Sequence, residues 1–144
     1  MPVRCVAFDA DDTLWDFTTA MGQGLALAVA AAQQRGPDAT GALTVDDLVA
    51  RFDALYALHV AEEKPGRHIG ELRGESFAQA LADLGVDDPG LVEHMAEVYF
   101  EHRHGSLPLF AETAAVLAEL GREHLLGLVT NGNTDAERSG LAGT

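Results

Sequence analysis

The sequence predicts an α/β fold, and three observations indicate it. Two short apolar runs, residues 3–8 and 124–129, are typical of strands. The stretch between them has the apolar spacing of helices. Each apolar run stops at a polar cluster, residues 9–13 after the first and residues 130–133 after the second. Because ligands of open parallel sheets bind beyond the carboxyl ends of the strands, these two clusters form the candidate functional site.

Composition limits the class of protein. The 144 residues are 47% hydrophobic and 22% charged, which is the mixture of one globular domain or of one domain with a modest insertion. The 23 acidic residues against 9 basic ones give a net charge of −14, and such a chain repels nucleic acid. Cys5 is the only cysteine, so no internal disulfide can form, and a reducing, cytoplasmic location is expected.

Neither a membrane span nor a secretory leader is evident in the sequence. No run approaches the roughly 20 apolar residues that a bilayer requires. The N-terminus has no basic region or small-residue cleavage site ahead of a long apolar core. We therefore expect a soluble chain that is not exported and has no membrane partner.

Local signals predict the first three elements. The run 3–8 is β-branched at two positions and is predicted to be a buried strand. A helix is predicted over residues 18–34, where Arg35-Gly36-Pro37 breaks it. A second helix is predicted over residues 44–63, because the Thr44 hydroxyl precedes Asp47 by three residues, as in a capping box.

The remaining elements follow from glycine and proline. A third helix is predicted over residues 70–84 with Gly85 as its stop, and a fourth from Asp88-Pro89 to about residue 105. A fifth helix is predicted over residues 110–120, before the second strand. The predicted order is therefore strand, four helices, helix, strand.

The first polar cluster places three carboxylates, Asp9, Asp11 and Asp12, within four positions. Carboxylates this close repel one another, and Mg²⁺ is the hard cation that best compensates them while keeping places for water and phosphate oxygens. Side chains alternate along an extended segment, so Asp9 and Asp11 are expected on the same side. One could then attack phosphorus while the other protonates the leaving oxygen. The alternative is a turn whose acids are solvated or cap the following helix.

The second cluster offers a hydroxyl and backbone amides. Thr130 and Asn131 at a strand end, facing the acids, are what a phosphoryl group needs on its other side. Alternatively, Thr130 caps a helix and Asn131-Gly132 forms a turn. One basic patch, Lys64, Arg67, His68 and Arg73, could meet the anionic end of a substrate, with Arg73 as the main candidate; it could also be a surface loop that balances nearby glutamates.

Two segments resemble motifs of the haloacid dehalogenase-like (HAD) hydrolase superfamily. Phe8-Asp9-Ala10-Asp11-Asp12-Thr13-Leu14 resembles the first motif, and Leu126-Gly127-Leu128-Val129-Thr130-Asn131-Gly132-Asn133 resembles the second. The resemblance implies a Rossmann-like core, residues 1–15 and 107–144, with an inserted four-helix cap, residues 16–106. It implies that Asp9 is the nucleophile, that Asp11 is the general acid and base, and that Thr130 binds phosphate with help from Asn131. Mg²⁺ would bind the Asp9 carboxylate and the Asp11 backbone carbonyl.

Asp11 separates the branches of this superfamily. The true dehalogenases resemble the phosphatases but lack an acid at the position of Asp11, because displacing a halide needs no protonated leaving oxygen. The resemblance therefore implies hydrolysis of a small phosphomonoester, although a phosphomutase shares the same acid pair. A receiver-like phosphoacceptor domain is disfavoured by the close spacing of Asp9 and Asp11 and by the large helical insertion.

The chain departs from the family pattern in one respect. The lysine of the third motif and the acidic pair of the fourth are expected beyond the second strand and its helix, where this chain has ended. We therefore expect an incomplete core that holds only the first two strands. Such a sheet is marginal alone, so self-association through the unfinished sheet is expected. A noncatalytic fragment that serves as a binding or interaction module is the rival hypothesis.

Overall fold

The computed structural model describes residues 3–61, 69–105 and 107–129. The chain forms two compact units, one from residues 1–21 and 104–144 and the other from residues 22–103. These units are called here the sheet unit and the helical unit. The boundaries predicted for the two domains, after residue 15 and before residue 107, remain a prediction.

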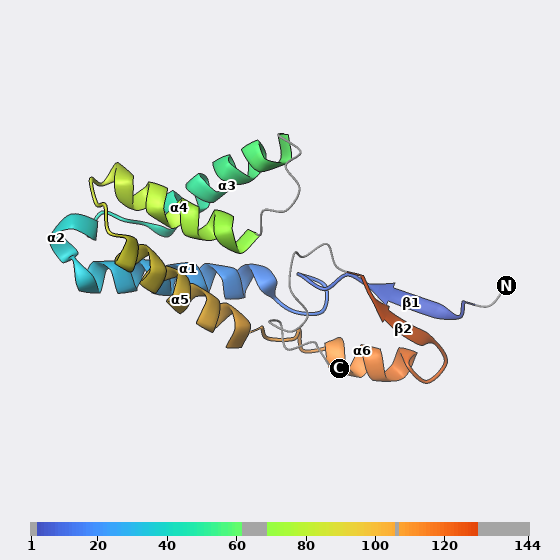
Figure 1. Ribbon diagram of the computed structural model, residues 1–144. Helices are drawn as coiled ribbons and strands as arrows, with labels where there is room; N and C mark the ends of the chain where they lie inside the picture. Colours follow the sequence, from blue (N-terminus) through green and yellow to red (C-terminus); the bar gives the residue numbers. More distant parts are fainter. Residues whose placement is uncertain (1–2, 62–68, 106, 130–144) are drawn as a thin grey trace. The chain divides into compact units, whose positions relative to one another are not determined.

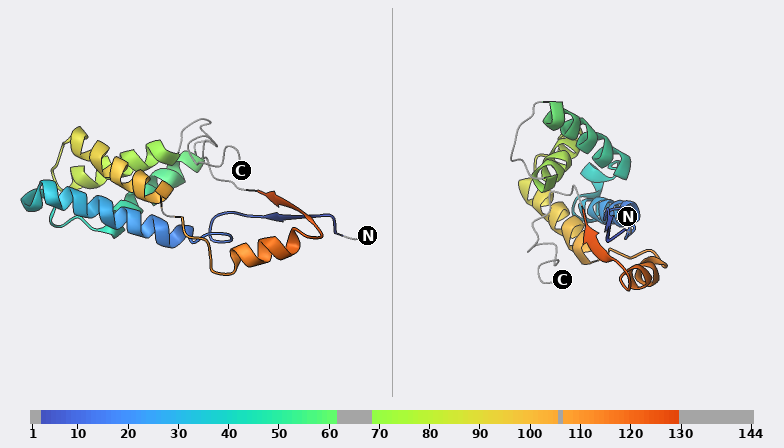
Figure 2. Two further views of the ribbon diagram at one scale, coloured as in Figure 1. Left: turned by 90° about the horizontal axis from the view of Figure 1, so that it is seen from below. Right: turned by 90° about the vertical axis from the view of Figure 1, so that its right-hand side faces the viewer.

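In its described residues, the sheet unit contains two parallel strands, one complete helix and the first turn of α1 (Figures 1 and 2). Strand β1 (Cys5–Phe8) pairs with β2 (Leu125–Leu128), so that Cys5 lies opposite Leu125 and Phe8 opposite Leu128. Helix α6 (Thr113–Leu120) precedes β2 and lies beside the strands. Because the strands run in the same direction, their carboxyl ends share one edge, where Asp9 follows β1 and Val129 follows β2.

The prediction that the first strand is buried was wrong. Cys5 and Ala7 are exposed, and in the second strand Leu125 is 74% exposed. A parallel strand is buried only when elements cover both faces of its sheet. Within the described part of this unit, α6 is the one complete helix, and a single helix cannot cover both faces of the sheet. The apolar pattern identified the strands correctly but not their burial.

Among the described residues, the helical unit contains α1 from Gly22 onward and four further helices, the last of which extends to Gly105. Their bounds are α1 (Phe17–Arg35), α2 (Pro37–Thr40), α3 (Val45–Ala61), α4 (Ile69–Asp83) and α5 (Pro89–Gly105). The four long helices were predicted within a few residues, whereas α2 was missed because Pro37 was interpreted as a break. Proline at the first position of a helix is instead well tolerated. None of the described helices is long and apolar enough to cross a membrane.

The ends of these helices confirm the predicted caps. The Asp47 backbone N–H donates to the Thr44 hydroxyl (3.2 Å), and the Thr44 N–H donates back to the Asp47 carboxylate (2.9 Å), as a capping box requires. Helix α4 ends at Asp83, and Gly85, two residues further on, has a φ of 75°, which suits glycine. The Leu91 N–H donates to the Asp88 carboxylate (3.0 Å) at the start of α5.

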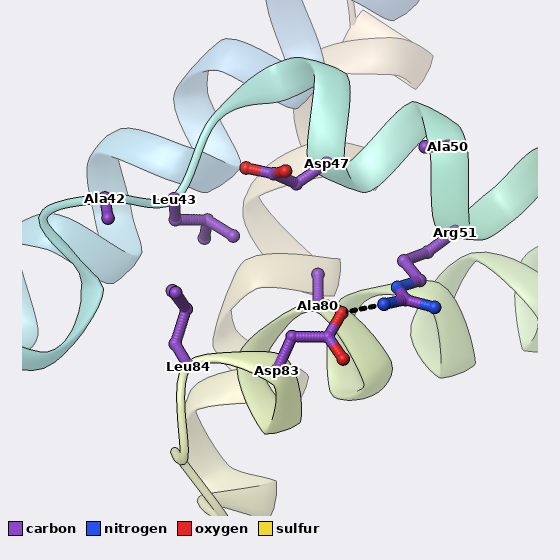
Figure 3. A pocket seen from close by; sticks show the side chains of 8 residues that line it. All are labelled: Ala42, Leu43, Asp47, Ala50, Arg51, Ala80, Asp83 and Leu84. Atoms are coloured by element: carbon purple, nitrogen blue, oxygen red, sulfur yellow. Dashed lines mark ion pairs between the residues drawn. The ribbon is translucent and has the colours of Figure 1, made fainter.

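Helices α3 and α4 pack against each other, and a surface pocket of about 290 Å³ lies beside their contact (Figure 3). Its base includes Leu43 and Ala80, each 2% exposed. At its rim Arg51 forms an ion pair with Asp83. Both side chains are about half exposed, so this pair contributes at most about 1 kcal/mol to stability.

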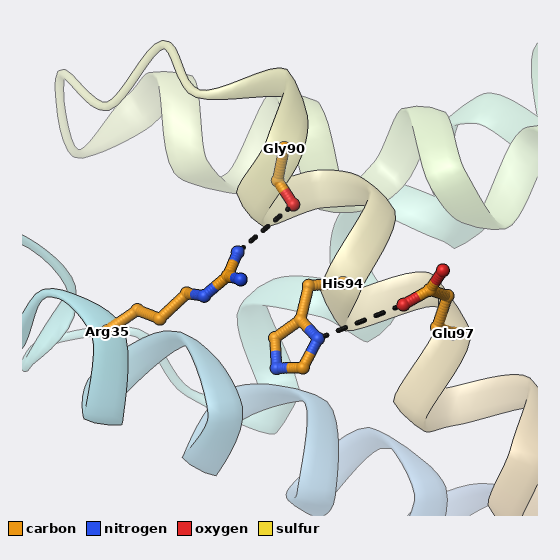
Figure 4. Close-up of polar contacts among 4 residues, drawn as sticks. All are labelled: Arg35, Gly90, His94 and Glu97. Atoms are coloured by element: carbon orange, nitrogen blue, oxygen red, sulfur yellow. Dashed lines mark hydrogen bonds and ion pairs between the residues drawn. The ribbon is translucent and has the colours of Figure 1, made fainter.

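Helices α1 and α5 approach each other closely at a glycine. A Cβ atom added at Gly24 would lie 3.1 Å from the Tyr99 ring, so the absence of a side chain lets the two helices meet there. Near the end of α1, Arg35 donates a hydrogen bond to the Gly90 carbonyl of α5 (3.3 Å; Figure 4). The core of the unit comprises residues from all four long helices: Leu25, Ala28, Ala32, Leu48, Leu72, Phe77, Leu81, Met95 and Tyr99.

Replacing Thr44 by Ala is expected to lower the free energy of unfolding by about 1 kcal/mol, because an N-cap hydroxyl and its reciprocal partner are lost. Urea denaturation followed by circular dichroism measures this change. Thr19→Ala is the matched control, since Thr19 is exposed in α1 and its side chain forms no hydrogen bond with a described residue, whereas its backbone N–H donates to Asp16. Equal midpoints for the two variants would contradict a stabilising capping box.

Candidate active site

The acidic cluster lies on a loop that folds back over the end of β1. The backbone N–H groups of Thr13 and Leu14 donate to the Ala10 carbonyl (3.3 and 2.9 Å), and the Asp12 N–H donates to the Trp15 carbonyl (2.9 Å). Asp12 has a φ of 56°, in the left-handed region that Asp visits more readily than most residues. Ala10, 1% exposed, anchors this turn.

A second group of hydrogen bonds ties the loop to a distant segment. The Asp16 N–H donates to the Pro108 carbonyl (3.0 Å), and the Phe110 N–H donates to the Leu14 carbonyl (3.2 Å). Trp15 forms isolated bridges with Asp11 on one side and with Leu109 on the other. We call residues 14–16 and 108–110 the connector ribbon. Both segments belong to the sheet unit, and in the sequence one precedes the helical unit and the other follows it.

Asp12 caps the N-terminus of helix α1, which begins at Phe17. Its carboxylate accepts hydrogen bonds from the Thr18 backbone N–H (2.9 Å) and from the Thr18 hydroxyl (2.6 Å). The hydroxyl, followed by the backbone N–H, holds the pKa of Asp12 below its ordinary value, because both bonds favour the ionised carboxylate. The alternative hypothesis, an acid that caps the following helix, therefore describes Asp12.

Asp11 has a different partner. One oxygen of its carboxylate, Oδ1, accepts a hydrogen bond from the indole Nε1–H of Trp15 at 2.8 Å. The bond is partly buried, and both residues belong to the sheet unit. The sequence analysis did not predict the contact between the indole and Asp11. Its only sequence signal is the four-residue separation between an acid and a tryptophan.

Asp9 is the least engaged of the three acids. It follows β1 directly, is exposed, and its carboxylate accepts no hydrogen bond and forms no ion pair with a described residue. An anionic oxygen that is not occupied by a neighbouring donor remains available to an incoming electrophile. The three carboxylates thus differ in their surroundings, although they are adjacent in the sequence.

The oxygen donors of this loop suit a magnesium ion. Mg²⁺ prefers one or two carboxylates and fills its other positions with water and substrate phosphate. The Asp9 carboxylate is unengaged, and none of the backbone hydrogen bonds among described residues uses the Asp11 carbonyl. No group of three or more His, Cys, Asp or Glu side chains that could hold a metal occurs in the described part of the chain. These residues therefore fit Mg²⁺ as a two-ligand partial site.

The second cluster begins beyond the described residues. Thr130 and Asn131 lie outside them, so their predicted roles stay predictions. The Val129 N–H donates to the Phe8 carbonyl (2.8 Å). Val129 immediately precedes Thr130, and Phe8 immediately precedes Asp9. The chain thus reaches the edge of the sheet where the acids lie, as the parallel register requires.

Arg73 lies inside the helical unit. It is 4% exposed, and its guanidinium carbon lies 3.6 Å from the ring centroid of Phe52 and 5.3 Å from that of Tyr99. Burial lowers the pKa of Arg73, and the neighbouring Tyr99 acts in the opposite direction. Contact with a substrate remains a prediction for Arg73. The other three residues of the predicted basic patch, Lys64, Arg67 and His68, lie outside the described residues.

The pocket beside α3 and α4 is not the candidate active site. Its lining belongs wholly to the helical unit and includes none of the residues predicted to act in catalysis or binding (Figure 3). The chemistry-bearing side chains instead gather on the loop after β1.

Comparison with known proteins identifies the family. Residues 3–143 match the family model of the haloacid dehalogenase-like hydrolases. The chain belongs to this family. Its α/β fold, an incomplete Rossmann-like HAD core with a helical insertion, is thereby confirmed, as is the resemblance noted in the two motifs.

Several solved structures have the same fold. The chain is 30% identical to a 2-haloacid dehalogenase from Pseudomonas syringae pv. Tomato DC3000, with a TM-score of 0.62 over 98% of this chain and 60% of that one. It is 23% identical to the HAD-hydrolase YfnB from Bacillus subtilis, solved bound to magnesium, with a TM-score of 0.67 over 99% of this chain and 60% of that one. It is 18% identical to L-2-haloacid dehalogenase from Xanthobacter autotrophicus, with a TM-score of 0.57 over 98% and 51% of the two chains.

The HAD chain described here is shorter than these relatives, since it spans 60% of the first two and 51% of the third. No curated protein matches it. The comparisons therefore establish a HAD-family hydrolase fold and leave the reaction to be argued from the site.

Replacing Asp12 by Asn is expected to weaken the acid dependence of stability. A lowered pKa means that the stabilisation by Asp12 is fully present above the ordinary carboxyl pKa of about 3.9 and is lost as the pH falls through the lower folded value. Wild type and Asp12→Asn should therefore differ most near pH 7 and converge at the acid end. Urea midpoints measured between pH 2.5 and 7 give this difference.

Thr18→Val is the graded companion to this variant. It removes the hydroxyl donor but keeps the backbone N–H, so its effect should have the same pH dependence and a smaller size. Curves for wild type and Asp12→Asn that run parallel over the whole pH range would refute a stabilising role for the ionised Asp12.

Proposed function

We propose that this HAD-family chain is the catalytic part of a magnesium-dependent phosphomonoester hydrolase that acts on a small phosphorylated metabolite through an aspartyl-phosphate on Asp9. The observation that carries the proposal is the unequal pair of carboxylates after β1. Asp9 is exposed and unengaged, whereas Asp11 is held by the Trp15 indole. A nucleophile and a positioned acid are the two groups that this reaction needs.

The first step uses both carboxylates. An Asp9 oxygen attacks phosphorus and forms an acyl-phosphate bond, while the bond from phosphorus to the leaving oxygen breaks. Asp11, protonated at the start, gives its proton to that oxygen, so the alcohol leaves neutral. In the second step the Asp11 carboxylate removes a proton from water, whose oxygen attacks phosphorus. The bond from phosphorus to Asp9 breaks, and phosphate, free Asp9 and protonated Asp11 result.

The remaining groups of the site bind and orient. The Asp9 carboxylate and the Asp11 backbone carbonyl would hold Mg²⁺, which when bound supplies positive charge against the phosphate oxygens. We assign binding of the phosphate to Thr130 with Asn131, and contact with the distal anionic end of the substrate to Arg73. A family member solved bound to magnesium supports the choice of metal.

A second candidate reaction is dehalogenation of a 2-haloacid. It is favoured by the structure that is 30% identical to this chain, which is a 2-haloacid dehalogenase. In that reaction Asp9 would attack carbon and displace a halide, which needs no proton from a neighbouring acid. Asp11 and its indole partner would then have no part in the displacement, so we prefer phosphate. A phosphomutase would use the same acids with a second substrate hydroxyl in place of water.

A third candidate is a noncatalytic module that pairs with a second copy of the chain through its sheet. The observation that favours it is the exposure of apolar strand residues, 74% for Leu125 and 66% for Val129. Neither outer edge of the two strands pairs with another described strand, so both edges offer hydrogen-bonding groups to another chain.

We also propose a cytoplasmic location, because Cys5 is a free thiol.

The catalytic proposal predicts magnesium-dependent release of phosphate from p-nitrophenyl phosphate. Asp9→Asn should abolish turnover. Asp11→Asn should lower kcat for an alkyl phosphate, whose leaving oxygen needs a proton, by about 10²–10⁴, the usual contribution of a positioned acid. Asp46→Asn, an exposed acid in the first turn of α3, is the matched control and should leave kcat unchanged.

Halide release from 2-chloropropionate, measured in the same preparations, separates the candidates. Halide release that persists in Asp11→Asn, together with no phosphate release by the folded wild type, would overturn the phosphatase and favour the dehalogenase. Absence of both activities would favour the noncatalytic module.

Self-association through the sheet predicts a concentration-dependent dimer in sedimentation velocity. Leu125→Lys should shift the distribution towards monomer, because a charge at a 74% exposed apolar position opposes burial in an interface. Val60→Lys, on a 57% exposed position of α3, is the matched control and should not change it. A wild-type chain that is monomeric at every concentration would contradict this prediction.

A further inference from the structure

Trp15 is held in place by its own backbone. Its carbonyl accepts hydrogen bonds from the N–H groups of Asp12 (2.9 Å) and Phe17 (3.0 Å). It forms bridges with Asp11 and with Leu109, which places it in the middle of the connector ribbon. These backbone hydrogen bonds fix the point from which the Trp15 side chain extends, and from there the indole reaches Asp11 within the sheet unit.

The indole can interact with Asp11 in only one way. Nε1–H is a donor and never an acceptor, so the oxygen that it contacts, Oδ1, must accept whether Asp11 is ionised or neutral. In a neutral carboxyl group, one oxygen is the carbonyl and the other carries the proton. The 2.8 Å bond from Trp15 thus selects Oδ1 as the carbonyl oxygen and leaves the proton to Oδ2.

We infer that Trp15 is a positioning residue for Asp11, fixing Oδ2 as the oxygen that gives the proton to the leaving group and later takes one from water. The inference rests on the proposed function, in which Asp11 is the general acid and base. A carboxyl group without this bond could rotate and present its proton in directions that miss the leaving oxygen. Orientation of this kind is a large part of what an active site contributes to rate.

The alternative is that Trp15 only fills space. Its burial is intermediate, as expected for a ring that packs against the loop, and packing alone would not depend on the N–H group. The two roles make different predictions for Trp15→Phe, which keeps an aromatic ring but lacks the donor.

The first experiment detects the bond without any turnover. Trp15 is the only tryptophan, so uniformly ¹⁵N-labelled full chain gives one indole N–H signal in an NMR correlation spectrum. Asp11→Ala should move this signal towards the position of an unbonded indole and speed its exchange with solvent. Asp46→Ala, in α3, is the matched control and should leave it unchanged. An indole signal that is unaffected by Asp11→Ala would overturn the inference, whatever the enzyme's activity.

The second experiment tests the consequence for catalysis. Trp15→Phe should lower kcat/KM for an alkyl phosphate, whose leaving oxygen needs a proton when the aspartyl-phosphate forms, by about tenfold or more. For p-nitrophenyl phosphate, whose leaving group departs readily as an anion, the loss in kcat/KM should be much smaller. The losses are compared in kcat/KM because hydrolysis of the aspartyl-phosphate, which also uses Asp11, is common to both substrates. In an Asp11→Asn background, Trp15→Phe should cause no further loss, because Trp15 acts through Asp11.

Equal losses for the two phosphates, or a further loss in the Asp11→Asn background, would show that Trp15 is only structural. A wild-type chain that releases no phosphate overturns the proposed function instead, and the NMR result then decides separately whether the indole holds Asp11. Thermal unfolding of Trp15→Phe shows whether the variant is folded when its kinetics are measured.

Discussion

The connector ribbon is the constraint on which the candidate active site depends. Leu14 accepts a backbone hydrogen bond from Phe110 and a side-chain bond from the Thr113 hydroxyl (2.8 Å), so residues almost a hundred positions apart are joined. This ribbon closes the long helical insertion at its two ends. The loop that carries the acids is therefore shaped by hydrogen bonds of the sheet unit itself.

Hydrogen-bond donors in the site stabilise the negative charges of neighbouring carboxylates. Three adjacent carboxylates in a chain of net charge −14 repel one another, and hydrogen-bond donors stabilise two of them. Thr18 supplies donors to Asp12, and Trp15 supplies one to Asp11. Asp9 accepts no hydrogen bond from a described residue, so its carboxylate remains available to bind a cation and to attack phosphorus. Identical side chains thus acquire separate roles from their neighbours.

What could be predicted from the sequence was local. The capping box of Thr44 and Asp47 and the stop at Gly85 depend on residues within a few positions, and both are present. The ribbon between Trp15 and Leu109 was missed because its partners are distant in sequence. The exposure of Cys5 and Ala7 in the first strand was missed because burial depends on elements that a strand's own pattern does not reveal. For the site, the motif identified Asp9 and Asp11, but the positive φ of Asp12 and the indole bond are properties of the folded loop.

The central claim is that Asp9 attacks phosphorus, and chemical trapping of the aspartyl-phosphate tests it most directly. Borohydride added to the chain during turnover of p-nitrophenyl phosphate with Mg²⁺ reduces an aspartyl-phosphate to homoserine, and mass spectrometry of the peptide that contains Asp9 locates the change. The account predicts this reduction at Asp9, only when the phosphate ester is present, and none in Asp9→Asn. Phosphate release by a chain whose Asp9 peptide is unchanged after borohydride, or phosphate release that persists in Asp9→Asn, would contradict the account.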